Sequence, residues 1–183
     1  MVSPHDKRVQ LRASLDAPEI VAAPGASDPI TAKLLELMGF AAVHVSGSVA
    51  HRTSGYSDAG ILTMHEMIER IATMGDVSNI PLIADADTGF GGAPNVVRTM
   101  KEYERAGASA VHIEDQLTPK RPMHMGAEGA FISDAEMVDK IRAAVDTRVD
   151  ADFLVIARCD IPDKQQKLER LHACLEAGAD IGW

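Results

Sequence analysis

Short apolar runs alternate along the chain with segments that have helical periodicity. The runs are short and rich in aliphatic residues, which is typical of strands buried on both faces of a parallel sheet. The segments between them carry apolar residues at three- and four-residue spacing, as helices do when one face packs on a sheet. The predicted strands are 19–24, 41–46, 81–87, 109–115 and 153–158, with 179–183 as a sixth candidate.

Helix start signals separate the predicted strands. Thr63 with Glu66, and Ser133 with Glu136, have the spacing of capping boxes. Another helix is predicted to begin at Asp28, with its apolar residues at Ile30, Leu34 and Leu37. A helix therefore connects most strands to the next.

One unit recurs in this pattern: a helix end, a glycine and a buried strand, at 36–46 and 104–114, with a third beginning at 176. Strands that alternate with helices predict right-handed crossovers and a parallel sheet. An open doubly wound sheet is the alternative, but no Gly-x-Gly-x-x-Gly turn follows the first strand, and polar residues follow nearly every strand, as in a barrel.

We therefore predict an α/β fold, a (β/α)8 TIM barrel that is C-terminally truncated to about five or six βα units. The expectation of truncation comes from length, because a complete barrel has eight strands and about 250 residues, whereas this chain has 183. Residues 1–183 are expected to form a single, incomplete barrel domain, with residues 1–18 as an N-terminal helix or extension.

Composition narrows the class of partner and the compartment. The formal net charge of -9 argues against nucleic acid or an anionic membrane as the partner. No apolar run approaches the ~18 residues of a membrane span, and no signal sequence is recognised, so a cytoplasmic location is expected. Cys159 and Cys174 are expected to be free thiols in a reducing compartment, with a single disulfide as the alternative.

The stretch PLIADADTGFGG at 81–92 ends a predicted strand in two aspartates. Residues two apart on a strand face the same side, so Asp85 and Asp87 should project together. Two such carboxylates repel unless a cation lies between them or one is protonated. Oxygen ligands with open positions suit Mg²⁺ better than zinc. The alternative is that the pair caps the following turn or helix.

Other predicted strands also end in polar residues. Ser46, Gly47 and Ser48 offer hydroxyls and amides for a carboxylate or enolate oxygen. Arg158 either pairs with a carboxylate or binds an anionic substrate. Each alone is typical of an ion-paired loop residue, but their convergence on one face indicates a site. The remaining polar strand ends are Glu114, Asp115 and Asp160.

Two histidines share the strand parity of these residues. His44 lies two positions before Ser46, and His112 lies two positions before Glu114. Both are therefore expected in the barrel interior, one layer below the site. We interpret them as core histidines whose hydrogen bonds are satisfied, with orientation of the site's ligands as the alternative.

Residues 20–182 resemble the isocitrate lyase / phosphoenolpyruvate mutase superfamily, in particular its short, methylisocitrate-lyase-like members. The most specific stretches are DADTGFG, GxxAVHIEDQ, PKR…H and KIRAAVDTRVDADFLVIARCD. The resemblance implies a (β/α)8 barrel that assembles as a homo-oligomer, either a tetramer or a dimer. It also implies Mg²⁺, with Mn²⁺ as an alternative, and cleavage or formation of a C–C or P–C bond through a pyruvate-type enolate.

The resemblance also implies roles for individual residues. Glu114 is expected to support the water shell of a metal bound by Asp85 and Asp87. Arg158 matches the arginine that neutralises the substrate, and Asp58 matches the aspartate of the loop after the second strand. The residues expected to hold the pyruvyl carboxylate and enolate oxygens are Ser46, Gly47 and Ser48.

The chain departs from the family in the loop that follows the fourth strand. Lyases of the family carry Lys-Lys/Arg-Cys-Gly-His there, whereas this chain reads KRPMH from Lys120 to His124. Pro122 replaces the cysteine that acts as acid and base, and proline cannot transfer a proton. Lys120 and His124 are the candidate proton donors. Cys159 belongs to a strand end and is not interpreted as the substitute.

Three functions remain open from the sequence. The first is a Mg²⁺-dependent carbon–carbon lyase that acts on a small 2-hydroxy di- or tricarboxylate of the methylisocitrate type. The second uses the same site as an oxaloacetate decarboxylase or hydrolase, or as a phosphonopyruvate-type mutase. The third is a non-catalytic truncated relative whose exposed strand edges pair with another chain.

Overall fold

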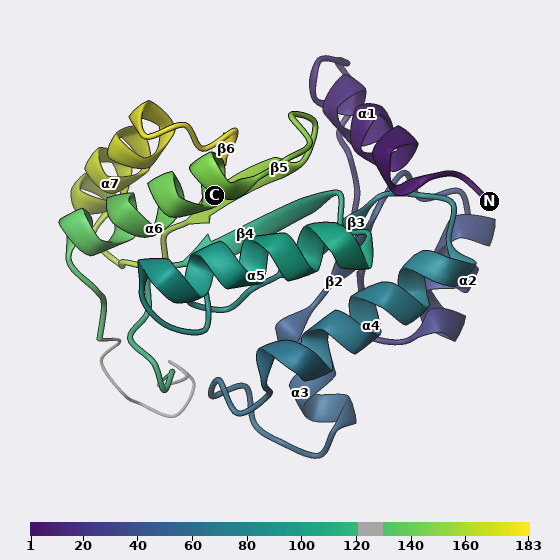
Figure 1. Ribbon diagram of the computed structural model, residues 1–183, viewed down its shortest axis with the longest axis horizontal. Helices are drawn as coiled ribbons and strands as arrows, with labels where there is room; N and C mark the ends of the chain where they lie inside the picture. Colours follow the sequence, from purple (N-terminus) through teal and green to yellow (C-terminus); the bar gives the residue numbers. More distant parts are fainter. Residues whose placement is uncertain (121–129) are drawn as a thin grey trace.

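The computed structural model describes residues 1–120 and 130–183 (Figure 1). Over these residues one six-stranded sheet runs in the order β1-β2-β3-β4-β5-β6, and every neighbouring pair is parallel. The prediction of an α/β fold with five or six βα units of a barrel is therefore confirmed. In the described part of the chain the sheet is not closed, because β1 and β6 are its two ends. The strands are β1 Gly25–Ala26, β2 Val43–Val45, β3 Leu82–Asp85, β4 Ala110–Glu114, β5 Leu154–Arg158 and β6 Ile181–Gly182.

Helices cover one face of this sheet (Figure 1). The apolar sides of α4, α5 and α6 pack against strand residues in one core cluster that includes Ile71, Met100, Ile141 and Val111. The opposite face is the barrel interior, and it carries the polar strand residues. The helices are α1 Pro4–Leu15, α2 Pro29–Leu37, α3 Gly47–Thr53, α4 Met64–Val77, α5 Ala93–Ala106, α6 Asp134–Thr147 and α7 Lys164–Glu176.

The helix start signals are confirmed. Thr63 and Glu66 form a complete capping box, with the Thr63 N–H donating to Glu66 at 2.7 Å and the Glu66 N–H donating to Thr63 at 3.3 Å. Ser133 accepts from the Glu136 N–H at 3.2 Å. These caps satisfy backbone donors that the first helical turn leaves free.

The predicted strand at 19–24 is wrong in position, because β1 begins only at Gly25. The Pro24 carbonyl accepts from the His44 N–H at 3.0 Å, so the chain joins the ladder just before β1. Proline has no N–H to donate in return, and Ile20 is 94% exposed. The segment before Pro24 therefore approaches the sheet without pairing with it. The other strands lie inside their predicted ranges, shortened at the ends.

The apolar stripe of α2 faces solvent. Ile30, Leu34 and Leu37 are 75%, 53% and 73% exposed, whereas Ala32 on the other side of the helix is fully buried. The helical periodicity is thus confirmed, but tertiary packing turns the small residue Ala32 inward.

The expected homo-oligomer stays a prediction.

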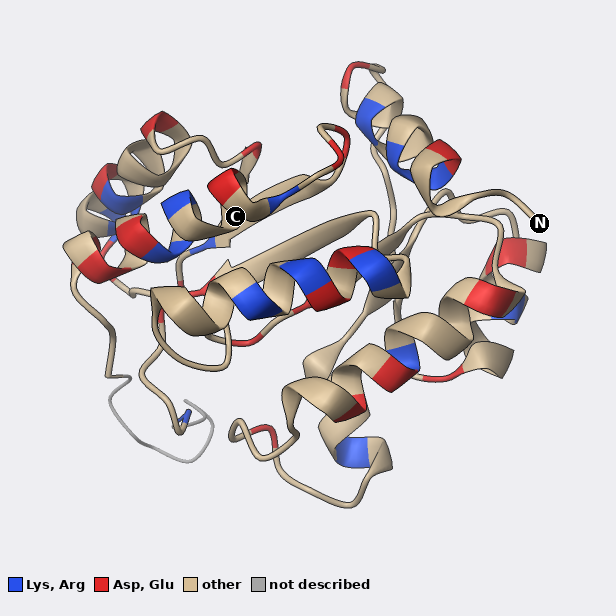
Figure 2. Ribbon diagram, viewed as in Figure 1, with Lys and Arg blue, Asp and Glu red and all other residues tan. Residues whose placement is uncertain are grey.

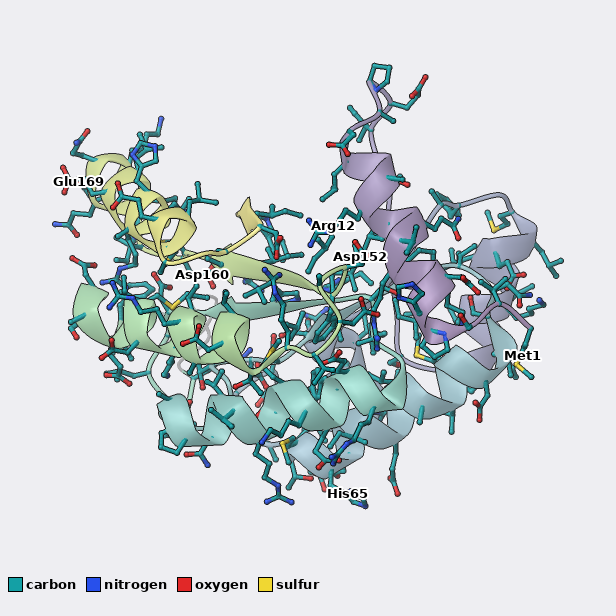
Figure 3. The ribbon with its side chains drawn as sticks, turned by 45° about the horizontal axis from the view of Figure 1, so that its top comes forward. Met1, Arg12, His65, Asp152, Asp160 and Glu169 are labelled. Carbon is teal, nitrogen blue, oxygen red and sulfur yellow. The ribbon has the colours of Figure 1, made fainter. Side chains whose placement is uncertain are left out.

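Helix α1 is anchored at the amino-terminal ends of the strands, away from the polar strand ends. Arg8 is buried and donates to the Ala108 carbonyl at 3.0 Å and to Asp150 at 2.9 Å. Arg12 pairs with Asp152 at 3.0 Å, and Figure 3 shows the two side chains close together. These contacts join α1 to the turn that precedes β5.

Charged residues of both signs are interleaved along the solvent-facing sides of α5 and α6 (Figure 2). Mixed charge of this kind is typical of solvated helices. Among the described residues, the helices are all too short or too polar to cross a bilayer.

Candidate active site

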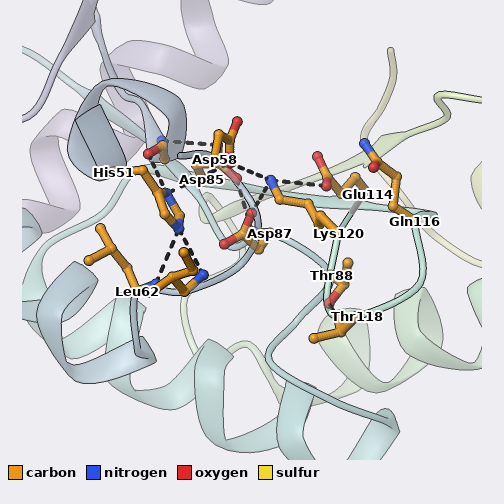
Figure 4. A network of polar contacts seen from close by, with 12 residues as sticks. His51, Asp58, Leu62, Asp85, Asp87, Thr88, Glu114, Gln116, Thr118 and Lys120 are labelled. Atoms are coloured by element: carbon orange, nitrogen blue, oxygen red, sulfur yellow. Dashed lines mark hydrogen bonds and ion pairs between the residues drawn. The ribbon is translucent and has the colours of Figure 1, made fainter. Parts of the chain in front are cut away.

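Four carboxylates and one ammonium group meet at the carboxyl ends of β3 and β4 (Figure 4). The Lys120 Nζ lies 3.0 Å from Asp58 Oδ1 and 3.2 Å from Glu114 Oε1, and it also contacts Asp87. Asp85 lies beside Asp87, whose N–H donates to Asp85 Oδ1 at 2.9 Å. Of the predicted site residues, the structure therefore brings these five together, and Arg158 joins them 3.2 Å from Glu114 Oε2.

Asp85 is held both by its carboxylate and by its backbone carbonyl. Its Oδ2 accepts from the Gly47 N–H at 3.0 Å, and its carbonyl accepts from the Tyr103 hydroxyl at 3.1 Å. A Cβ at Gly47 would lie 2.7 Å from the same Oδ2, so only glycine permits this approach. Tyr103 was not predicted as part of the site, because its apolar spacing on α5 indicates only a core residue.

The chain turns sharply immediately after Asp85. Asp87 and Phe90 both have positive φ, at 49° and 58°, which is uncommon outside glycine. At Gly89, with φ of 86°, a Cβ would lie 2.5 Å from Val96. The run of glycines thus permits a tight turn that brings Asp87 back towards Asp85, and strained backbone of this kind is concentrated at functional sites.

The cluster carries more negative than positive charge. The carboxylates are Asp58, Asp85, Asp87 and Glu114, and the cations are Lys120 and Arg158. Arg158 lies 3.2 Å from Glu114 and also pairs with Asp160. When all four carboxylates are ionised, their charge exceeds that of the two cations by two. Burial opposes the ionisation of Asp85, but the His112 imidazole, the Lys120 ammonium and the Asp87 N–H together hold its pKa below the usual value.

The pKa shifts of the other two carboxyls have the opposite sign. Burial and the neighbouring charge of Asp85 raise the pKa of Asp87. Burial raises the pKa of Glu114 to about 7, although Lys120 and Arg158 attract its charge. Neither oxygen of Glu114 accepts a hydrogen bond from the described residues. A hard divalent cation would balance this excess of buried oxygen charge, so the donor set fits Mg²⁺ or Mn²⁺.

Glu114 should make the metal-free protein less stable as the pH rises. Its pKa is about 7 in the folded chain against a usual 4.5, so folding takes up a proton between these values. The free energy of unfolding should therefore fall as the pH rises from about 4.5 to about 7. Denaturant unfolding in EDTA should show a smaller fall for Glu114→Gln. An equal fall in both proteins would contradict the assignment.

Arg158 is fixed at the rim of the site. Its guanidinium binds both oxygens of Asp160 at 3.0 Å and stacks over the Trp183 ring at 4.9 Å from the centroid. Gln116 also donates to Asp160, at 2.9 Å. Arg158 is only half-buried, so it remains able to meet an anion from the open side of the cluster.

The segment from Ser46 to Ser48 forms the start of α3 rather than a loop. Ser46 is the helix cap, and its hydroxyl accepts from the Val49 N–H at 3.3 Å. The Gly47 amide was expected to be exposed to a substrate oxygen, but it donates to Asp85 instead. The expectation of an exposed amide at Gly47 is therefore wrong, because β2 delivers Gly47 directly against β3.

His51 was not singled out from the sequence, yet it connects α3 to the loop that carries Asp58. Its Nδ1 lies 2.8 Å from the Gly47 carbonyl, and its Nε2 lies 3.1 Å from the N–H groups of Ile61 and Leu62. Because Nε2 accepts two N–H groups, Nδ1 carries the proton. The position of Asp58, 3.7 Å from Nδ1, thus depends on this fully buried ring.

Asp115 points away from the cluster. It is fully buried and accepts from Arg170 at 3.0 Å and from the Cys159 thiol at 2.9 Å. Its neighbour Glu114 faces the interior, so alternation along β4 sends Asp115 to the helical layer. Asp115 therefore forms a structural ion pair with Arg170.

Cys159 should not react in the native protein. Burial and the hydrogen bond to Asp115 raise the pKa of this free thiol to about 12. Burial likewise raises the pKa of free Cys174 to about 11. Iodoacetamide at about pH 8 should therefore label neither thiol until the chain is unfolded, because the thiolate is the nucleophile. Rapid native labelling, read by mass spectrometry, would contradict this.

His44 and His112 lie in the barrel interior as predicted, with their Nε2 atoms 2.8 Å apart. Burial lowers the pKa of His112 to about 4, so this ring is neutral at neutral pH, and burial also lowers the pKa of His44. Of the two candidate proton donors, Lys120 lies in the cluster, and His124 lies outside the described residues. Burial opposes the charge of Lys120, but Asp87 and Glu114 outweigh it and raise its pKa.

The chain is similar to known enzymes. The family model of phosphoenolpyruvate phosphomutase matches residues 11–182. A 2,3-dimethylmalate lyase of Eubacterium barkeri is 47% identical over 94% of this chain and 61% of its own length. A 2-methylisocitrate lyase of Vibrio cholerae serotype O1 is 40% identical over 86% of this chain and 52% of its own length.

A solved structure of phosphonopyruvate hydrolase in complex with oxalate and Mg²⁺ superposes with a TM-score of 0.89 at 38% identity. The match covers 99% of this chain and 62% of the hydrolase chain. The chain thus spans less than two thirds of each of these relatives. It belongs to the phosphoenolpyruvate mutase / isocitrate lyase superfamily.

Proposed function

We propose that the chain forms the catalytic part of a Mg²⁺-dependent carbon–carbon lyase. Its substrate would be a small 2-hydroxy di- or tricarboxylate of the methylisocitrate or dimethylmalate type. The observation that carries the proposal is the buried cluster of Asp58, Asp85, Asp87 and Glu114 with one resident ammonium, since its charge excess suits a divalent cation. The lyase relatives support this reaction class.

Asp85 and Asp87 would hold the ion, with Glu114 supporting its water shell. When bound, the ion would supply Lewis-acid stabilisation of negative charge on the substrate oxygens, and Mg²⁺ is the first choice with Mn²⁺ as the alternative. Arg158 would bind a substrate carboxylate from the rim, and Ser46 and Ser48 at the start of α3 would face the same carboxylate. These residues would orient the scissile bond.

In the proposed reaction the bond between the hydroxyl-bearing carbon and its neighbour breaks. The hydroxyl proton passes to Asp58, and a carbonyl forms on that carbon. The electron pair of the broken bond stays on the neighbouring carbon as an enolate of its carboxylate, and this carbon then takes a proton. Lys120, 3.0 Å from Asp58, is the donor that the described residues offer.

The raised pKa of Lys120 sets a condition on that role. While Asp87 and Glu114 are unneutralised, the ammonium is a weak acid that serves to balance their charge. Its acidity rises only when another cation shares these carboxylates. Proton donation by Lys120 therefore depends on a filled site.

A substrate panel tests the proposal. The chain, and a parent protein if one contains it, should cleave 2,3-dimethylmalate or 2-methylisocitrate with Mg²⁺, measured as release of the keto-acid product. Turnover should disappear in EDTA and in Asp87→Ala. Cleavage that persists without a divalent ion, or no cleavage of any 2-hydroxy acid in either protein, would contradict it.

Hydrolysis or decarboxylation of oxaloacetate, or chemistry on a phosphonopyruvate, is the second candidate. It is favoured by Pro122 in place of the loop cysteine, because these reactions do not need that cysteine, and by the fold shared with phosphonopyruvate hydrolase. Loss of oxaloacetate or release of phosphate in the same panel, without lyase turnover, would select it. A non-catalytic truncated relative would turn over none of these compounds, and a monomer that unfolds cooperatively and binds Mg²⁺ tightly would count against it.

A further inference from the structure

The buried pair His44 and His112 is not used by the proposed reaction. The two side chains lie on β2 and β4, directly beneath the carboxylate cluster, and His112 is fully buried. His112 sits beside Asp85 in the β3–β4 ladder. The pair therefore adjoins the residue that the proposed function assigns to the metal.

The facing nitrogens share one proton. His44 Nε2 and His112 Nε2 lie 2.8 Å apart, which is a hydrogen-bond distance. Two N–H groups could not face each other at this separation, and two bare lone pairs would repel. One ring thus donates and the other accepts.

The remaining nitrogen of His112 decides which ring donates. Its Nδ1 is buried without a hydrogen-bond partner among the described residues, and Asp85 Oδ1 lies 3.7 Å away. A nearby carboxylate favours an N–H over a lone pair at that position. If Nδ1 carries the proton, His112 Nε2 must accept, and His44 Nε2 must donate. The order is then His44 N–H to His112, and His112 N–H towards Asp85.

A second metal site is the competing interpretation, since ligand atoms of His44, Asp85 and His112 all lie within 4.8 Å of one another. However, the Nε2 atoms of His44 and His112 lie 2.8 Å apart, which is a hydrogen-bond distance. Two imidazole nitrogens that ligate one tetrahedral ion, each about 2.1 Å from it, would lie about 3.4 Å from each other. The geometry favours a hydrogen bond between the two rings, with the second nitrogen of His112 directed at Asp85.

We propose that His44 and His112 are positioning residues, which orient the Asp85 carboxylate for a divalent cation through a chain of fixed proton order. The metal part of this inference rests on the proposed function. Asp85 already accepts from Gly47 and Asp87, and the His112 Nδ1, 3.7 Å from Asp85 Oδ1, attracts the carboxylate electrostatically from below. Both rings lie nearly perpendicular to the Trp183 ring, at 6.2 Å and 5.1 Å between centroids, which limits their rotation.

Nitrogen-15 NMR of the imidazole rings tests the proton order without any metal. His112 should be the Nδ1–H tautomer and His44 the Nε2–H tautomer. The reverse assignment for either ring would overturn the proposal. Because the measurement uses the unmodified chain, it determines the proton order of the two rings even if a variant does not fold. It does not depend on Mg²⁺ either. A chain that binds no Mg²⁺ would count against the proposed function alone.

Calorimetric titration with Mg²⁺ tests the positioning role. His44→Phe keeps a ring but loses the donor, and it should raise the Mg²⁺ dissociation constant by about 10-fold, the effect of losing an outer partner of a ligand. His44→Gln retains a donor and should lie within about 3-fold of the unmodified chain. Ile83→Val, beside His44 in the sheet, controls for packing and should bind as the unmodified chain does. Unchanged binding by a folded His44→Phe would overturn the proposal.

Discussion

Replacement of Asp85 by asparagine is expected to weaken Mg²⁺ binding by about 100-fold or more. Loss of a residue that hydrogen-bonds a metal ligand lowers the metal affinity by about 10- to 100-fold. Loss of a carboxylate that itself ligates the metal should lower the affinity by at least the upper value. Asparagine can still accept from the Gly47 N–H, as Asp85 does at 3.0 Å. The fold should therefore persist, and calorimetric titration of the folded variant gives the affinity directly.

The same substitution should cost the metal-free protein some stability. The pKa of Asp85 is lowered in the fold, so its charge contributes stability, and the one amide oxygen of asparagine cannot accept from both Gly47 and Asp87. Relief of the repulsion between Asp85 and Asp87 offsets part of this cost. Asp160→Asn is the matched control, since Asp160 lies at the same rim but pairs with Arg158. Its Mg²⁺ affinity should stay within about 3-fold of the unmodified chain, below the loss expected for an outer partner. Equal losses in the two variants would contradict a specific role for Asp85.

Replacement of Lys120 by methionine is expected to destabilise the metal-free protein by about 3 kcal/mol. Removing one partner of a buried ion pair leaves uncompensated charge, at a typical cost of about 3–5 kcal/mol. Lys120 is 7% exposed and contacts Asp58, Asp87 and Glu114. Protonation of Glu114 would relieve part of the repulsion, so the lower end of the range is expected. Denaturant unfolding in EDTA measures the difference.

Mg²⁺ should restore most of the stability that Lys120→Met loses, because a divalent cation can balance the same carboxylates. The gain in unfolding free energy on adding Mg²⁺ should therefore be larger in the variant than in the unmodified chain. Lys33→Met is the control, since Lys33 forms a half-buried i,i+3 pair with Glu36 on α2, and helical pairs of this spacing contribute about 0.2–0.5 kcal/mol. A variant that is stable in EDTA, or one that Mg²⁺ does not stabilise, would contradict the account of the cluster.

Much of the site could be predicted because strand parity and chain direction fix it. In a parallel sheet every strand ends at the same edge, so Asp85, Glu114 and Arg158 had to converge once their strands were recognised. Register then places Glu114 beside Arg158. The inward direction of His44 and His112 follows from the same alternation.

Contacts that depend on loop paths could not be predicted. The ammonium of Lys120 reaches Asp87 and Asp58 from a segment after β4, and nothing in local periodicity specifies that path. The role of His51 depends on where the loop of Asp58 returns to α3. The side of α2 that packs inward could not be predicted either. Periodicity identifies an apolar stripe along a helix but does not show which side of the helix meets the sheet.

The central claim is that the acid cluster binds one divalent cation. The most direct measurement is the anomalous diffraction signal of Mn²⁺ introduced into crystals of the chain. One peak should touch the carboxylates of Asp85 or Asp87 and disappear in Asp85→Asn. A peak only at the surface group of His5, Asp150 and Asp152, or no peak at all, would contradict the claim.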